Sequence, residues 1–183
     1  MIDATQFRQG MSFLTGAVSV VTTSGVSGRY GFTASAVCSV SDSPPTLLVC
    51  INRASASHPH FVQNGLLAVN VLSVQQQPLA IAFSSVKAPE QRFQEGVWLQ
   101  LETGAPVLAD ALASFDCRIV SNHEIGTHDV FICHVVAVHQ SDQIDQSRGL
   151  VYFKRGYFEV GSVGQGCDKV SILSRPLVTS VAR

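Results

Sequence analysis

The segment from Gly31 to Asn52 constrains the fold of this chain more than any other stretch. It begins with small residues, Gly31-Phe-Thr-Ala-Ser-Ala36, and later carries two adjacent prolines. Because proline fixes φ and removes a backbone donor, this pattern predicts two short strands joined by a polar turn. We expect the turn to hold Ser39, Ser41, Asp42, Ser43, Pro44 and Pro45.

Small residues in a strand allow a flat molecule to approach the backbone, and they leave hydroxyl and N–H groups facing it. The polar turn from Asn52 to His58 follows directly, and its serines and Arg53 suit an anion. Together the two features predict a planar, phosphorylated ligand along a sheet edge. The alternatives are a small-residue strand packed under a helix, and a solvated turn with Ser57 as a helix cap.

The composition indicates one domain of ordinary size. The chain has 183 residues, of which 46% are hydrophobic and 14% are charged, with a formal net charge of −1. Few charges beside many apolar residues indicate a surface covered in an oligomer, although a weakly charged monomer is the alternative. The balanced charge gives no reason to expect a nucleic acid or a membrane surface as partner.

The five cysteines are odd in number and form no CxxC pair, so we expect reduced, mostly buried thiols. No secretory signal and no membrane-spanning apolar run is visible, which favours a cytoplasmic protein. His58-Pro-His60 lacks the spacing of a helical metal pair, and no metal site is expected.

The hydrophobic patterns predict many short strands and few helices, typical of a mainly β fold, a β-barrel with small peripheral helices. Helices are expected over 3–15, with Asp3 and Gln6 forming a capping box, over 57–64, and over 75–84. Strands are expected over 17–23, 31–37, 46–52, 66–72, 113–120, 130–140 and 149–153. Residues 1–158 form the predicted domain, and 159–183 form a tail of unassigned role.

Four blocks of this sequence resemble one known family. They are Thr33 to Asn52, Ser114 to Ile119, Gly126 to Asp129 and Gly149 to Arg155. The chain is similar there to the flavin reductase components of two-component monooxygenases, nearest to those serving pyrimidine monooxygenase and 4-hydroxyphenylacetate 3-monooxygenase. The resemblance implies a split β-barrel of the Greek-key, FMN-binding type, and a homodimer with flavin near its interface.

The resemblance also implies roles for individual residues. The ring and ribityl chain of the flavin would lie against Thr33, Ala34, Ser35, Ala36, Ser39, Val40 and Ser41. The phosphate would lie at Asn52, Arg53, Ser55 and Ser57. Apart from the resemblance, Arg92 is a candidate for a second cation by its charge, and a solvated arginine is the alternative. The resemblance places His128 against the nicotinamide. As aromatic residues, Phe61 and Tyr152 are candidates for covering a ring, and a place in the core is the alternative.

The resulting hypothesis is an NAD(P)H:flavin oxidoreductase that reduces FMN or FAD and releases it, by diffusion, to a separate monooxygenase. NADH is the expected donor, because no basic pocket for a 2′-phosphate is evident. The sequence contains no GxGxxG motif, which argues against a Rossmann nucleotide site. The alternatives are an oxidase of the pyridoxamine-phosphate-oxidase type and a non-enzymatic flavin-binding protein.

Overall fold

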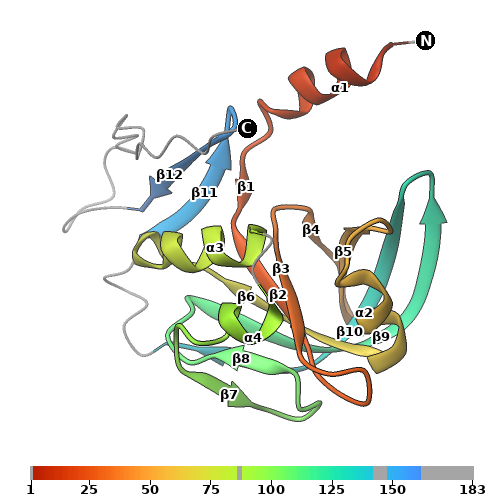
Figure 1. Cartoon of the computed structure of the whole chain (residues 1–183), viewed down its shortest axis with the longest axis vertical. Helices are drawn as coiled ribbons and strands as arrows, with labels where there is room; N and C mark the ends of the chain where they lie inside the picture. The colour runs from red at the N-terminus through yellow and green to blue at the C-terminus, as the bar shows by residue number, and fades with distance from the viewer. Residues whose placement is uncertain (1, 86–87, 142–147, 162–183) are drawn as a thin grey trace.

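The computed structural model describes residues 2–85, 88–141 and 148–161 of the chain (Figure 1). Its helices are α1 (Ala4–Met11), α2 (His58–Asn64), the 3-10 helix η1 (Val74–Gln76), α3 (Gln77–Ser84) and α4 (Pro89–Arg92). Its strands are β1 (Gly16–Ala17), β2 (Ser19–Thr23), β3 (Tyr30–Ala34), β4 (Val37–Asp42), β5 (Pro45–Asn52), β6 (Leu66–Val71), β7 (Trp98–Gln100), β8 (Pro106–Leu108), β9 (Ala113–Ile125), β10 (His128–Gln140), β11 (Gly149–Phe153) and β12 (Gly156–Val160). No described helix is long and apolar enough to cross a membrane.

Seven of these strands form a curled antiparallel sheet in the order β3-β2-β6-β9-β10-β5-β4 (Figure 1). Among the described residues, two smaller sheets have the orders β1-β11-β12 and β7-β8. The two end strands of the seven-stranded sheet, β3 and β4, follow one another in the chain and are joined only by Ser35 and Ala36. Within the described ranges no ladder pairs β3 with β4, so the barrel stays split along this line. The predicted mainly β, split-barrel fold with small helices is confirmed.

Apolar side chains fill both faces of the curled sheet. On one face Phe61 of α2 packs with Val49, Phe131 and other strand residues that are at most 7% exposed. On the other face α3 contributes Ala80 and Phe83 to a second cluster. Helix α2 therefore packs against one face of the curled sheet, and helix α3 packs against the other.

The N-terminal helix α1 extends away from the sheets (Figure 1). Asp3 accepts hydrogen bonds from the backbone N–H groups of Thr5 and Gln6, and the Gln6 side-chain oxygen accepts from the Asp3 N–H, so the predicted capping box is confirmed. No residue of α1 is buried, although Phe7 and Met11 are apolar. The helix is thus stabilised by its cap and exposes an apolar surface.

The predicted polar turn over 39–45 is wrong in its extent. Residues 37–42 form β4, which pairs with β5 as far as Asp42 and Pro45, so the turn is confined to Ser43 and Pro44. The hydroxyls of Ser39 and Ser41 are therefore on a strand. The predicted strand over 31–37 is not continuous, because β3 ends at Ala34, β4 begins at Val37, and Ser35 and Ala36 lie between them.

The hairpin of β9 and β10 is longer than predicted, because both strands continue to a turn at Gly126 and Thr127. The predicted domain boundary at 158 falls inside β12, which continues to Val160. Most of the predicted tail, residues 162–183, lies outside the described residues. Ser57 precedes α2 as predicted, but its side chain makes no capping hydrogen bond.

Candidate functional site

A cavity of about 550 Å³ lies in the curve of the sheet beside β4. One wall carries the hydroxyl-bearing residues Ser35, Ser39 and Ser41. The other lining residues come from several strands and from the chain before β2: Thr15, Gly16, Ala17, Ser19, Val37, Cys38, Pro45, Thr46, Leu47, Val69, Val71, Phe115, Val135 and Val138. Apolar walls with a few hydroxyls suit a flat apolar ring that has one polar edge.

The chain before β2 closes one side of this cavity. A Cβ atom added at Gly16 would lie 3.0 Å from the carbonyl oxygen of Ser35, so β1 passes Ser35 at a distance that favours glycine. Gly16 also pairs with Tyr152 of β11. Tyr152 is 36% exposed and packs edge-on against Tyr157, so it stands near the cavity without lining it.

The structure divides the predicted flavin-ring residues into two groups. Ser35, Ser39 and Ser41 line the cavity, whereas Thr33, Ala34, Ala36 and Val40 do not. The Thr33 hydroxyl donates to the carbonyl of Ala80 in α3 at 2.6 Å, and Ala34 is buried in the core. For β3 the alternative interpretation, a small-residue strand packed under a helix, therefore describes the contacts better.

The predicted phosphate turn is ordered by its own hydrogen bonds. The Asn52 side chain accepts from the Ala54 N–H at 2.9 Å, and the Asn52 carbonyl accepts from the Ser55 N–H at 2.9 Å. Ser57 is only 3% exposed, and its hydroxyl lies 3.3 Å from the carbonyl of Gly31. Its hydroxyl thus holds the turn against β3 rather than facing solvent.

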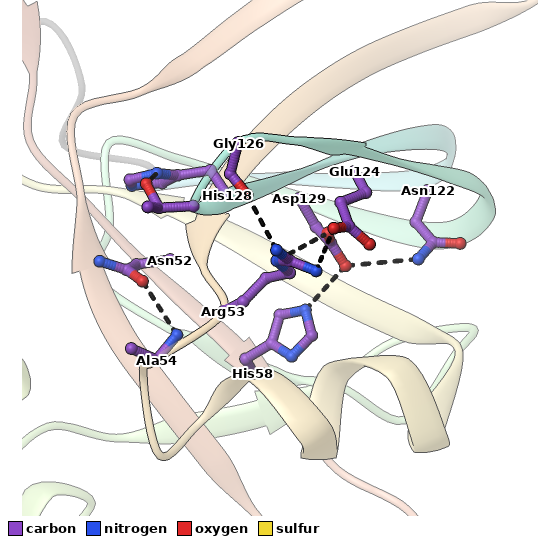
Figure 2. Close-up of polar contacts among 10 residues, drawn as sticks. Asn52, Arg53, Ala54, His58, Asn122, Glu124, Gly126, His128 and Asp129 are labelled. Carbon is purple, nitrogen blue, oxygen red and sulfur yellow. Dashed lines mark hydrogen bonds and ion pairs between the residues drawn. The ribbon is translucent and has the colours of Figure 1, made fainter.

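His128 lies beside this turn (Figure 2). It is the first residue of β10 and pairs in register with Asn52 of β5. Its side chain is exposed, and its Nδ1 lies 2.9 Å from the hydroxyl of Thr127. The Arg53 N–H donates to the Thr127 carbonyl at 3.0 Å, so the fold brings the predicted phosphate turn and the predicted nicotinamide contact together.

Two further residues of the predicted site, Phe61 and Arg92, contact other parts of the protein. Phe61 is fully buried and meets Phe32 edge-on, which is the core role that the sequence left open. The Arg92 guanidinium donates to the carbonyls of Gly31 and Ser85, each at 2.9 Å, so it links α4 to β3 and to the end of α3.

Sequence reasoning missed a buried, hydrogen-bonded pair behind His128, formed by His58 and Asp129. His58 Nε2 donates to Asp129 Oδ2 at 2.8 Å. This bond holds the pKa of the Asp129 carboxyl below its ordinary value, assisted by Asn122 and Arg53 and opposed by burial. The two residues are 71 positions apart, so no local pattern could have revealed the pair. No three His, Cys, Asp or Glu side chains form a metal-binding group in the described part of the chain.

The predictions from the sequence also left out most of the apolar residues that line the cavity. Val135 and Val138 both line the cavity although an odd number of positions separates them. A register irregularity between Val135 and Ala137 leaves Val136 without a partner on β9 and shifts the alternation of β10. A simple two-residue period cannot predict such a shift.

Comparison with known proteins identifies the class to which this fold and cavity belong. Residues 11–161 match the family model of the flavin reductase like domain, and the chain belongs to this family.

Particular members of the family are closely similar. An FMN reductase (NADH), RutF 1, of one strain of Methylorubrum extorquens is 53% identical over 156 residues, which cover 85% of this chain and 76% of the relative. A Haemophilus somnus protein described as a flavin reductase has a TM-score of 0.83 at 48% identity, covering 87% of this chain and all of that one. BorF, the flavin reductase component of a bacterial two-component tryptophan halogenase, has a TM-score of 0.77 at 30% identity, covering 86% and 98%.

Proposed function

We propose that this protein is an NADH-dependent flavin reductase that acts on FMN. The observation that carries the proposal is the 53% identity, over 85% of the chain, to a relative named FMN reductase (NADH). The cavity supports it, because its apolar walls and its Ser35, Ser39 and Ser41 hydroxyls match a ring with one polar edge. Bound FMN would supply the hydride acceptor, and the protein supplies binding and orientation.

We assign the two ends of the flavin to the two groups of residues. β4 runs antiparallel to β5, with Ser39 opposite Leu47, and the Ala36 carbonyl accepts from the Cys50 N–H at 3.1 Å. The segment from Ser41 back to Ala36 therefore leads from the cavity toward the turn after Asn52. A nucleotide lying along it would have its ring at the cavity and its phosphate near that turn.

In this assignment the protein needs no acid, base or nucleophile of its own. Hydride transfer requires two stacked rings with the reacting atoms about 3–3.5 Å apart. The cavity walls hold one ring and exclude water from its inner face. His128, exposed beside Asn52, holds the nicotinamide nucleotide at the open side.

The test is steady-state oxidation of NADH by the purified protein with FMN, FAD or neither added. We expect turnover with FMN and NADH, and lower kcat/KM with FAD and with NADPH. A clear preference for NADPH would overturn the donor assignment. Tight flavin binding without turnover would favour a flavin-binding protein, and oxidation of an amine substrate without NADH would favour an oxidase of the pyridoxamine-phosphate-oxidase type.

We further propose that the reduced FMN leaves by diffusion and serves a separate monooxygenase. The similarity to BorF, a component of a two-component halogenase, supports a partnership of this kind. A monooxygenase held behind a dialysis membrane from the reductase should remain active when NADH and FMN are supplied. Activity only on direct mixing would indicate transfer within a complex.

We propose that the protein is a homodimer. Helix α1 buries none of its residues, and the segment around it exposes Phe7 (55%), Met11 (46%), Phe13 (53%) and Leu14 (65%). A second copy would cover this apolar surface. Sedimentation equilibrium should give twice the chain mass, and changing Phe7 and Leu14 to Ser should shift the equilibrium toward monomer. A wild-type protein that stays monomeric well above the assay concentration would contradict the proposal.

A cytoplasmic location accords with this function, since NADH and reduced thiols are maintained there. The described cysteines, Cys38, Cys50, Cys117 and Cys133, are all free thiols. Fractionation of cells that express the tagged protein tests the location.

A further inference from the structure

Behind the exposed His128, five residues form a connected group that we call the Asp129 cluster (Figure 2). They are Arg53, His58, Asn122, Glu124 and Asp129. Adjacent residues of a strand face opposite sides, so Asp129 is buried (4% exposed) while His128 faces outward. The Asp129 carboxylate accepts from His58 at 2.8 Å and from the Asn122 amide at 3.4 Å.

Arg53 ties the turn after β5 to the β9–β10 turn. Its guanidinium pairs with Glu124 at 2.5 Å and donates to the Gly126 carbonyl at 2.9 Å. Its backbone N–H donates to the Thr127 carbonyl at 3.0 Å. Arg53 alone therefore makes three contacts with the β9–β10 turn region, at Glu124, Gly126 and Thr127. The same guanidinium that the sequence assigned to the phosphate is already occupied by protein groups.

One atom of the cluster lacks a hydrogen bond. Asp129 Oδ1 is buried and has no hydrogen-bond partner in the described structure, and Arg53 Nε stands 4.0 Å from it. A buried carboxylate oxygen without a donor depends on nearby positive charge. Arg53 supplies that charge and His58 donates a hydrogen bond to the other carboxylate oxygen, and the lowered pKa of Asp129 accords with an ionised carboxylate. Such a group holds its neighbours firmly, because moving either one exposes an uncompensated charge.

We propose that Asp129 is a positioning residue: through His58 and Arg53 it holds the 52–58 turn against the β9–β10 turn, and so fixes His128 for the nicotinamide nucleotide. The inference rests on the proposed function. Among the described polar groups, the His128 side chain hydrogen-bonds only with the neighbouring Thr127 hydroxyl, so its position depends on the backbone that the cluster holds. A misplacement of about 1 Å in such a site can cost about a hundredfold in rate.

The test compares Asp129→Asn with wild type by stopped-flow reduction of pre-bound FMN at varied NADH concentration. Asparagine keeps the shape and removes the charge. We call the ratio of the flavin-reduction rate constant to the Kd for NADH the NADH efficiency. We expect this ratio to fall by about tenfold, while the Kd for FMN changes by less than about threefold. The matched control is Glu159→Gln, which removes a carboxylate from the Arg148–Glu159 ion pair of the β11–β12 hairpin and should leave both quantities unchanged.

A double-mutant cycle with His128→Ala separates positioning from general destabilisation. If Asp129 acts through His128, then Asp129→Asn should have little further effect in the His128→Ala background. Equal effects in both backgrounds, or wild-type NADH kinetics in Asp129→Asn, would refute the proposal. If the wild-type protein does not oxidise NADH with FMN, the proposed function fails first and this inference fails with it.

If Asp129→Asn does not fold, His58→Gln and His58→Ala replace it. Glutamine can still donate to Asp129, so His58→Gln should retain more NADH efficiency than His58→Ala at equal FMN affinity. Equal NADH efficiency in the two variants would refute the positioning role.

Discussion

Two buried polar side chains, Asn70 and Asp129, are satisfied to different degrees. The Asn70 amide donates to the Val20 carbonyl at 2.9 Å and accepts from the Leu108 N–H at 2.8 Å and the Ser114 hydroxyl at 2.9 Å. It therefore joins β2, β8 and β9 with neutral bonds that pH does not alter. Asp129 instead depends on charged neighbours, so its contribution to stability should vary with pH.

The pH dependence of Asp129 has a definite sign. Its folded pKa lies below its ordinary value, so the folded state favours the ionised form. The resulting stabilisation is complete above the unfolded pKa of about 3.9 and is lost as pH falls through the folded pKa. Wild type should therefore exceed Asp129→Asn in unfolding free energy most near neutral pH, and the difference should shrink below about pH 4. Urea denaturation of both proteins at neutral and at acidic pH measures it, and a constant difference would contradict the assignment.

At the scale of elements, the packing of α3 on β3 (Tyr30–Ala34) explains the glycine at position 31. An added Cβ at Gly31 would lie 2.7 Å from Cε1 of Phe83 and 3.0 Å from the Val21 carbonyl oxygen. The flat group that approaches the backbone at Gly31 is thus a ring of this chain. Of the small residues between Gly31 and Ser41, the ones that line the cavity begin only at Ser35, where β3 ends.

Gly31→Ala should destabilise the fold by about 1–3 kcal/mol, because the phenyl ring must move in a packed core. Urea denaturation measures the loss. Gly10→Ala is the control, since an added Cβ there meets nothing within 4 Å and alanine favours the helix. Unchanged stability with impaired FMN binding would instead show that Gly31 faces a ligand.

At the scale of the whole molecule, the cavity exists only because distant segments meet. Its lining runs from Thr15 to Val138, and the curl of the sheet brings these ends together. On β10 the irregularity at Val136 allows both Val135 and Val138 to face the cavity. Val138 lines the cavity and Val136 does not, and this difference offers a test of the assigned flavin site.

Val138→Trp should fill part of the cavity and weaken FMN binding by about tenfold or more. Val138 is 53% exposed, so the fold should tolerate the larger side chain. Val136→Trp is the matched control, because Val136 is similarly exposed (41%) and does not line the cavity. Fluorescence titration with FMN compares the variants. Equal affinities would place the flavin elsewhere.

Features that depend on neighbouring residues and on repeated patterns could be predicted from the amino-acid sequence. The Asp3–Gln6 capping box is present, α3 lies within the predicted helix over 75–84, and β5 covers the predicted strand over 46–52. The family also followed from the sequence, because several ordered blocks of residues carry the resemblance.

Which side chains face the cavity and which face the protein became evident from the folded chain alone. Thr33, Ser57 and Phe61 are turned toward α3, β3 and the core by packing that no local pattern records. His58 and Asp129 meet across 71 positions, and irregular strand pairing sets the side of β10 that lines the cavity. The physical reason is range: caps and alternation act within a few residues, whereas burial and charge pairing depend on segments that only the fold brings together.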